Sequence, residues 1–148
     1  MWDMMRRGVN VCIGTDGTSS NNDLDMWDEM RSAALLQKVA GDDPCVMPAC
    51  EVLKAATVNA AKALGREGEL GIVAEGAEAD VILVDLQRPH LQPCHDIVSR
   101  LVYCGKASDV DTVFVAGRRL VSGGRLTQCD QMQLIKDANE RVSEILAR

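Results

Sequence analysis

The clearest chemical signal in this sequence is a carboxylate at the start of a polar loop. Residues 14–25 read GTDGTSSNNDLD and follow the apolar run VNVCI. Such a loop after a buried strand is where α/β enzymes place catalytic groups, because strand ends converge and loops supply binding contacts. Asp16 is therefore the first catalytic candidate. The structural alternative is a turn between strand and helix, in which Asp25 only caps the helix.

Two histidines are a second candidate for chemistry. His90 and His95 lie five residues apart in RPHLQPCH. Two imidazoles and a carboxylate could bind zinc, which commonly has three protein ligands at a catalytic site. Their spacing is not an established ligand pattern, so we expect surface or hydrogen-bonded histidines.

Four further aspartates flank two apolar runs: Asp80, Asp85, Asp109 and Asp111. Each could be half of an acid/base pair, but acidic residues at strand ends usually form turns or are solvated. The sequence has no GxxxxGK[ST], GxGxxG, GxSxG or HExxH motif. This removes the commonest phosphate, dinucleotide, serine-hydrolase and zinc-protease functions.

Composition restricts the partners and the compartment. The 148 residues carry 16 Lys and Arg against 22 Asp and Glu, a net charge of -6. A negative balance disfavours nucleic acid and anionic membranes, which require a positive surface. The sequence shows neither an apolar membrane span nor a secretory signal, and its six cysteines form no CxxC pair. We therefore expect a cytoplasmic protein with reduced, structural thiols, no nucleic acid partner and no membrane partner.

The elements that position the loop form an α/β segment. The apolar run at 9–15 predicts a strand buried on both faces. Asp25 and helical spacing predict a helix over 26–39, and Gly41 to Pro44 end it. A second helix is expected from Pro48 to Leu64, stopped by Gly65.

After Gly65 the pattern changes to short strands. Strands are expected at 81–86, at 101–104 and in a hairpin over 113–124 that turns at 116–118. Asp130 and Gln133 have the spacing of a capping box and predict a C-terminal helix of about four turns. We expect three segments: 1–66, 67–128 and 129–148. A complete eight-stranded barrel needs about 250 residues and does not fit.

These patterns resemble a known family. Residues 8–38, GVNVCIGTDGTSSNNDLDMWDEMRSAALLQK, are similar to the last barrel strand and following helix of the metal-dependent amidohydrolase superfamily. The resemblance is to the branch that deaminates thioadenosine and adenosylhomocysteine or dechlorinates triazines. Further blocks agree in order: LKAATVNAAKALG, LGIVAEGAEADVILVDL, PHLQP and LVYCGKASDVDTVFVAGRRLVSGGR.

The resemblance implies a fold class and a site. The fold is α/β: the last βα unit of the barrel, the C-terminal strands of the small β-sandwich domain and a C-terminal helix, not a complete barrel. Asp16 matches the aspartate that ligates or borders the catalytic metal, zinc or iron in the intact family, and acts as general base on its water. Ser20, Asn21 and Asn22 match a segment that borders the substrate pocket.

The family's other metal ligands and its acid-base glutamate are absent. The resemblance therefore implies a C-terminal fragment of an aminohydrolase for purine or triazine-like rings, which binds no metal and has no turnover by itself. One alternative is a self-standing oligomeric binding module, and another is a subunit that completes a barrel with a partner chain. Unpaired strand edges predict a homodimer. An oligomer that rebuilds a metal site from Asp16 and His90 or His95 of another copy is a further alternative.

Overall fold

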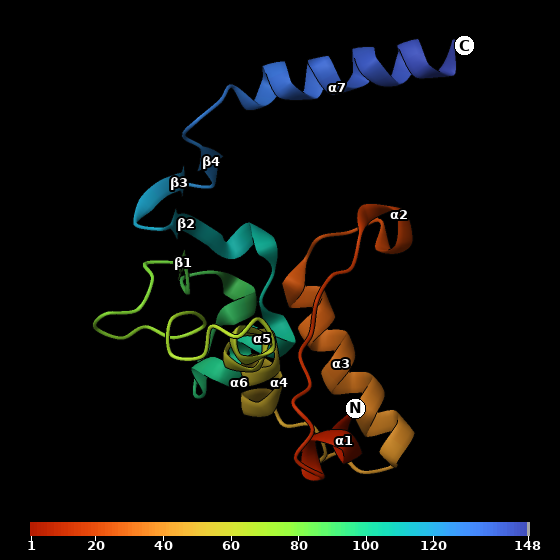
Figure 1. The fold of residues 1–148 in the computed structure, drawn as a ribbon, viewed down its shortest axis with the longest axis vertical. Coiled ribbons are helices and arrows are strands. Elements are labelled where there is room, and N and C mark those ends of the chain that lie inside the picture. The colour runs from red at the N-terminus through yellow and green to blue at the C-terminus, as the bar shows by residue number, and fades with distance from the viewer. Residues whose placement is uncertain (148) are drawn as a thin grey trace.

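The computed structural model describes residues 1–147 as a helical layer, a small antiparallel sheet and a separate C-terminal helix. The elements of the helical layer are α1 (Trp2–Arg6), α2 (Thr18–Asn21), α3 (Met26–Gly41), α4 (Ala49–Ala56), α5 (Val58–Ala63) and α6 (Ile97–Cys104). Figure 1 shows the helical layer at the N-terminal end and α7 (Gln131–Leu146) at the other.

The sheet has four strands in the order β1-β2-β3-β4, and each neighbouring pair is antiparallel. Its strands are β1 (Val81–Val84), β2 (Val110–Val115), β3 (Arg118–Ser122) and β4 (Arg125–Leu126). The predicted hairpin turn is confirmed between β2 and β3. Ala116 and Gly117 both have positive φ, 47° and 73°, as a two-residue turn matched to the strand twist requires. The sheet is not closed into a barrel.

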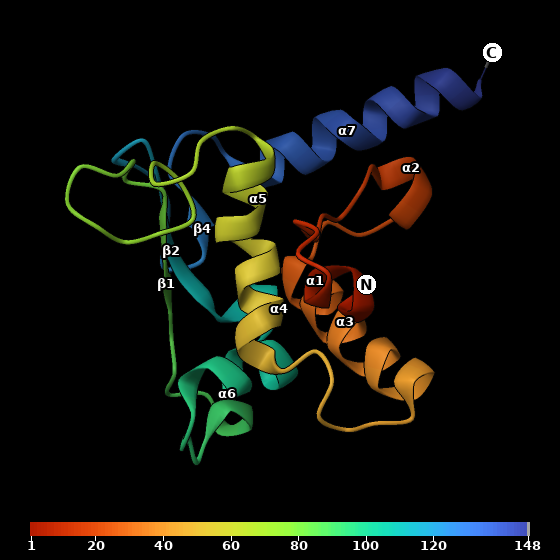
Figure 2. The same ribbon diagram turned by 60° about the horizontal axis from the view of Figure 1, so that its bottom comes forward.

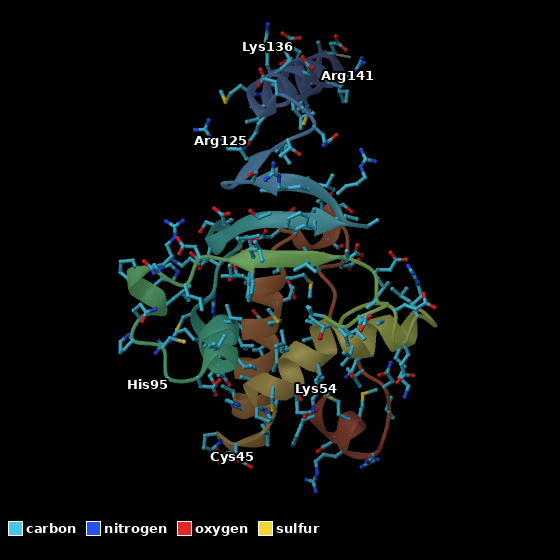
Figure 3. All side chains as sticks on the ribbon, turned by 90° about the vertical axis from the view of Figure 1, so that its left-hand side faces the viewer. Cys45, Lys54, His95, Arg125, Lys136 and Arg141 are labelled. Atoms are coloured by element: carbon cyan, nitrogen blue, oxygen red, sulfur yellow. The ribbon has the colours of Figure 1, made fainter. Side chains whose placement is uncertain are left out.

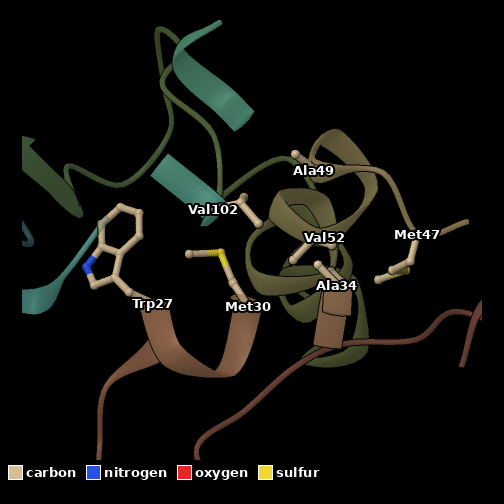
Figure 4. Packing of buried hydrophobic residues seen from close by; sticks show 8 residues of the cluster. Trp27, Met30, Ala34, Met47, Ala49, Val52 and Val102 are labelled. Atoms are coloured by element: carbon tan, nitrogen blue, oxygen red, sulfur yellow. The ribbon is translucent and has the colours of Figure 1, made fainter. Parts of the chain in front are cut away.

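The core lies where α4 packs against α3 and α6 (Figure 2). Val52 of α4 and Val102 of α6 are fully buried, and Met30 and Trp27 of α3 complete the contact (Figure 4). Small residues on the facing surfaces, Ala34 and Ala55, are fully buried as well. Their small side chains allow the helices to pack closely.

The predicted helix at 26–39 is confirmed, together with its cap. Oδ1 of Asp25 accepts the backbone N–H of Trp27 at 2.8 Å. The helix ends at Gly41, and Asp42 follows in the left-handed conformation. The C-terminal helix is also confirmed, because Asp130 caps α7. Its capping box is only half formed, since the Gln133 side chain donates to Asp137 instead.

Two elements differ in the structure from their prediction. The run at 101–104 is the end of helix α6 and not a strand. Asp96 caps this helix by accepting the N–H groups of Val98 and Ser99, and a short apolar run does not by itself distinguish a strand from a buried helix. The expected second helix is divided at Thr57, whose hydroxyl donates to the Leu53 carbonyl and competes with the helical pattern.

The segment at 9–15 is extended, but it is not the buried strand that its apolar run predicts. No strand among residues 1–147 pairs with it. Instead, the Ile13 N–H donates to the Ala55 carbonyl at 3.0 Å. Nδ2 of Asn10 donates to the Asn59 carbonyl of α5, and Nδ2 of Asn59 donates to the Val11 carbonyl. The backbone groups of an extended segment need hydrogen-bond partners. Here the C-terminal end of α4 and the start of α5 provide some of them in place of a neighbouring strand.

On α7, the side chains of Lys136 and Arg141 point away from the sheet (Figure 3). The apolar side chains of this helix are exposed, including Met132 and Leu146. Within residues 1–147, no helix is both long and apolar enough to cross a lipid bilayer.

Candidate functional site

Asp16 lies at the start of the loop between the extended segment and α3. Its φ is 58°, in the left-handed region, which costs a non-glycine residue about 1–3 kcal/mol and occurs preferentially at functional sites. Oδ1 accepts the N–H of Gly17 at 2.8 Å. Within the described residues Oδ2 accepts no hydrogen bond, so the exposed carboxylate has one oxygen free to act as a base.

The loop returns toward α3 through the short helix α2. Ser20 donates its hydroxyl to the Gly17 carbonyl, and Asn22 is left-handed, with φ of 53°. Asn21 has two bonds, because its Nδ2 donates to the Thr15 carbonyl at 2.9 Å and to Oε1 of Glu29 at 2.6 Å. The structure thus brings the three predicted substrate-pocket residues onto one loop with Asp16. Their contact with a substrate stays a prediction.

Two residues of α3 that the sequence analysis did not single out fix this loop and its helix. Glu29 receives the Asn21 amide. Arg31 donates Nε to the Tyr103 carbonyl at 3.0 Å and Nη2 to the Gly105 carbonyl, at the C-terminal end of α6. Arg31 also pairs with Asp28. The helical periodicity identifies Glu29 and Arg31 only as polar positions. It does not show their partners, which lie in a loop or far away in the sequence.

The two histidines do not join Asp16. Nε2 of His90 lies 2.8 Å from Oδ2 of Asp109, a buried carboxyl. The prediction of a hydrogen-bonded histidine is confirmed for His90. His95 is exposed and lines a surface pocket of about 250 Å³ with Arg100 and Tyr103.

The other candidate carboxylates have structural partners. Oδ1 of Asp80 accepts the N–H of Ala116 in the hairpin turn. Asp85 accepts the Gln87 N–H and pairs with Arg88, and Asp111 accepts the Thr112 hydroxyl. Asp80 and Asp85 thus act as turn formers, and Asp111 is a solvent-exposed residue of β2, as expected for these three.

The described residues do not fit a catalytic metal by themselves. Among residues 1–147, no three His, Cys, Asp or Glu side chains are grouped closely enough to hold an ion. Asp16 is one carboxylate, and a catalytic zinc commonly needs three protein ligands. The six cysteines are free thiols, as expected. Four of them, Cys12, Cys45, Cys50 and Cys129, are exposed and take no part in the core.

The sequence and this geometry were compared with known proteins. A model described as "Amidohydrolase family" matches residues 1–120. The chain belongs to the amidohydrolase family. This confirms the family that the loop motif and the later blocks predict.

This amidohydrolase chain is similar to curated and solved members of the predicted branch. The 5-methylthioadenosine/S-adenosylhomocysteine deaminase of Moorella thermoacetica is 48% identical over 140 residues, which are 95% of this chain and 33% of the relative. A zinc-bound adenosine deaminase from Xanthomonas campestris has a TM-score of 0.93 and 36% identity, over 98% of this chain and 33% of that one.

A zinc complex of atrazine chlorohydrolase from Arthrobacter aurescens has a TM-score of 0.83 and 29% identity, over 92% of this chain and 30% of that one. The expected fold class is confirmed: a mixed α/β chain that matches amidohydrolase structures and is not a complete barrel. The chain spans about a third of the length of the relatives it matches. The expected segment boundaries, homodimer and cytoplasmic location stay predictions.

Proposed function

We propose that this chain supplies the Asp16 loop of an aminohydrolase that deaminates adenosine-type nucleosides or related purine and triazine-like rings. The observation that carries the proposal is Asp16 itself, left-handed, exposed and with one carboxylate oxygen free. In hydrolytic deamination, water attacks the ring carbon that bears the amino group, and ammonia leaves. Asp16 accepts the proton of the attacking water as a general base.

Most of the ligands that would hold the metal for this chemistry lie outside the described residues. Structures of two relatives contain zinc, and the resemblance allows zinc or iron. Asp16 provides one carboxylate at this place, while the remaining ligands must come from other polypeptide. Residues 1–147 by themselves therefore lack the ligand set for a catalytic ion, and we expect no turnover from this segment alone.

A chimera tests the proposal directly. The matched third of the Moorella thermoacetica deaminase is replaced by this chain, and ammonia release from S-adenosylhomocysteine is measured. We expect an active chimera, and Asp16→Asn should lower kcat by about 10²- to 10⁴-fold, the usual contribution of a general base. Glu75→Gln is the matched control, because Glu75 is an exposed carboxylate with no hydrogen bond or ion pair among residues 1–147. Turnover by the isolated chain, or full activity of Asp16→Asn, would contradict the proposal.

Self-association is the second candidate and would make the chain an oligomeric binding module. No strand among residues 1–147 pairs with the outer edge of β1. Ile82 and Leu83, which point to opposite faces of this strand, are 48% and 51% exposed. Open apolar edge strands tend to pair with another chain.

Light scattering on the purified chain tests this second candidate. We expect a homodimer that becomes a monomer in Ile82→Lys, because a charge on the edge strand opposes pairing. Val73→Lys is the control, since Val73 is exposed and lies outside the sheet. A wild-type chain that is monomeric at every concentration would exclude the candidate.

A further inference from the structure

Besides the N-cap bonds of Asp25, a short hydrogen bond between two side chains joins the Asp16 loop to α3. Nδ2 of Asn21 lies 2.6 Å from Oε1 of Glu29, and both side chains are half-buried. The acceptor is a carboxylate, and hydrogen bonds to a charged group are stronger than those between neutral groups. Glu29 therefore holds the loop more firmly than an uncharged side chain would.

The same amide group continues the connection to Asp16. Asn21 uses its second amide proton on the Thr15 carbonyl, at 2.9 Å. That carbonyl belongs to the peptide group that includes the backbone N of Asp16. Because φ of Asp16 is the rotation about its N–Cα bond, fixing this peptide plane opposes any change in φ from 58°.

We propose that Glu29 is a positioning residue that acts through Asn21 and the Thr15 carbonyl to hold Asp16 in its left-handed conformation. The inference rests on the proposed function of Asp16 for its catalytic consequence, but its conformational part does not. In this proposal the Asn21 amide group binds other groups of the chain, since both of its N–H donors already have acceptors. Only the carbonyl oxygen of that side chain is left for other contacts.

Glu29 belongs to a helix that is packed into the core, so its side chain can hold Asp16 in a strained conformation. Glu29 lies in the first turn of α3, four residues after the N-cap Asp25. Trp27 and Met30, on either side of it in the sequence, are buried in the core. A left-handed Asp16 persists only if its surroundings determine its conformation, and a packed helix N-terminus provides such surroundings.

The test uses the full 148-residue chain and NMR. A positive φ brings the amide proton and the α proton of one residue close together, so Asp16 should show a strong intraresidue cross-peak. We expect Glu29→Ala to remove most of this cross-peak and to shift the Asn21 side-chain amide signals. Glu29→Gln keeps a carbonyl acceptor and should retain part of the effect. Glu75→Gln should change neither signal.

Folding is monitored in the same samples. The amide signals of α4 and α6 report the core, and they should be unchanged in Glu29→Ala. If that variant does not fold, Asn21→Ala, which removes the same connection from the loop side, is used in its place. An unchanged Asp16 cross-peak in a folded variant of either residue overturns the inference.

The catalytic consequence is measured in the chimera with the Moorella deaminase. Glu29→Ala should lower kcat by about 10- to 100-fold, as small misplacements of a reacting group do, and leave KM unchanged. A rise in KM with unchanged kcat would overturn the positioning role. An inactive wild-type chimera would count against the proposed function alone, because the NMR result on the chain stands separately.

Discussion

Oδ2 of Asp109 accepts two bonds, from Nε2 of His90 at 2.8 Å and from the Lys106 N–H at 3.0 Å. Asp109 is only 2% exposed, and its carbonyl accepts the N–H of Asp85 just after β1. One buried residue therefore joins the end of β1 to the short helices η1 (Pro89–Leu91) and η2 (Ala107–Asp109). His90, one of the two histidines considered as zinc ligands, is here part of a structural connection.

Removing this carboxyl should destabilise the chain. We expect Asp109→Ala to lower the free energy of unfolding by about 2–4 kcal/mol, because a half-buried imidazole and a backbone N–H lose their charged acceptor. Urea denaturation measures the loss. Asp111→Asn is the control, since Asp111 is exposed and its carboxylate bonds only the neighbouring Thr112 hydroxyl. Equal effects of the two substitutions would show that the connection contributes nothing.

Arg31 should contribute more to stability than the exposed Arg141. It donates to two carbonyls at the end of α6, while Arg141 makes one exposed ion pair on α7. Arg31→Ala should cost about 2–3 kcal/mol, and Arg31→Lys should recover only part of this because a lysine lacks the planar pair of donors. Arg141→Ala should change stability by less than about 0.5 kcal/mol. Thermal unfolding of the three variants compares them, and a similar melting temperature for Arg31→Ala and Arg141→Ala would refute the prediction.

Two glycines with positive φ should respond differently to alanine. A Cβ on Gly71 (φ 74°) would lie 2.7 Å from the carbonyl carbon of Thr57, between α4 and α5. A Cβ on Gly76 (φ 85°) would meet nothing within 4 Å. Gly76→Ala should therefore cost only the left-handed backbone energy, about 1–2 kcal/mol. Gly71→Ala adds a backbone clash and should cost about 3 kcal/mol or more. Denaturant midpoints that agree for the two variants would disprove the close approach.

Acid should weaken the N-terminus of α6. The Ser99 hydroxyl donates to Asp96 and, with the N–H groups of Ser99 and Val98, holds the pKa of that carboxyl below its usual value of 3.8. Because the folded pKa is the lower one, the stabilisation is fully present above the unfolded pKa and is lost as the pH falls through the folded pKa. Carbon NMR titration should show that Ser99→Ala raises the pKa of Asp96. Ser143→Ala, whose hydroxyl donates to the Asn139 carbonyl, should leave it unchanged. A titration of Asp96 that is identical in wild type and Ser99→Ala would contradict this cause.

Elements with local signals could be predicted from the sequence. Asp25 and Asp130 mark the starts of α3 and α7 correctly, since an N-cap bonds only the next two or three residues. The second half of α6, residues 101–104, is wrongly predicted as a strand, although the helix cap Asp96 is equally local. Its apolar run LVYC has only four residues and fits either period.

The candidate site was predictable only in part. The motif around Asp16 identifies the loop and, through the resemblance, the family. The sequence does not show that Glu29 receives the Asn21 amide, or that Arg31 reaches carbonyls more than 70 residues away. It also does not show that the extended segment at 9–15 bonds α4 and α5, because a strand pattern does not name its partner.

The sequence alone therefore determined the family, the capped helices α3 and α7, the β2–β3 hairpin and Asp16 as the candidate base. These follow from contacts between residues close along the chain and from a motif in one loop. Only the tertiary structure decided which groups meet: His90 with Asp109, Glu29 with Asn21, and Arg31 with the end of α6. The physical reason is that the range of a hydrogen bond is about 3 Å, so the path of the whole chain selects the donor that reaches each acceptor.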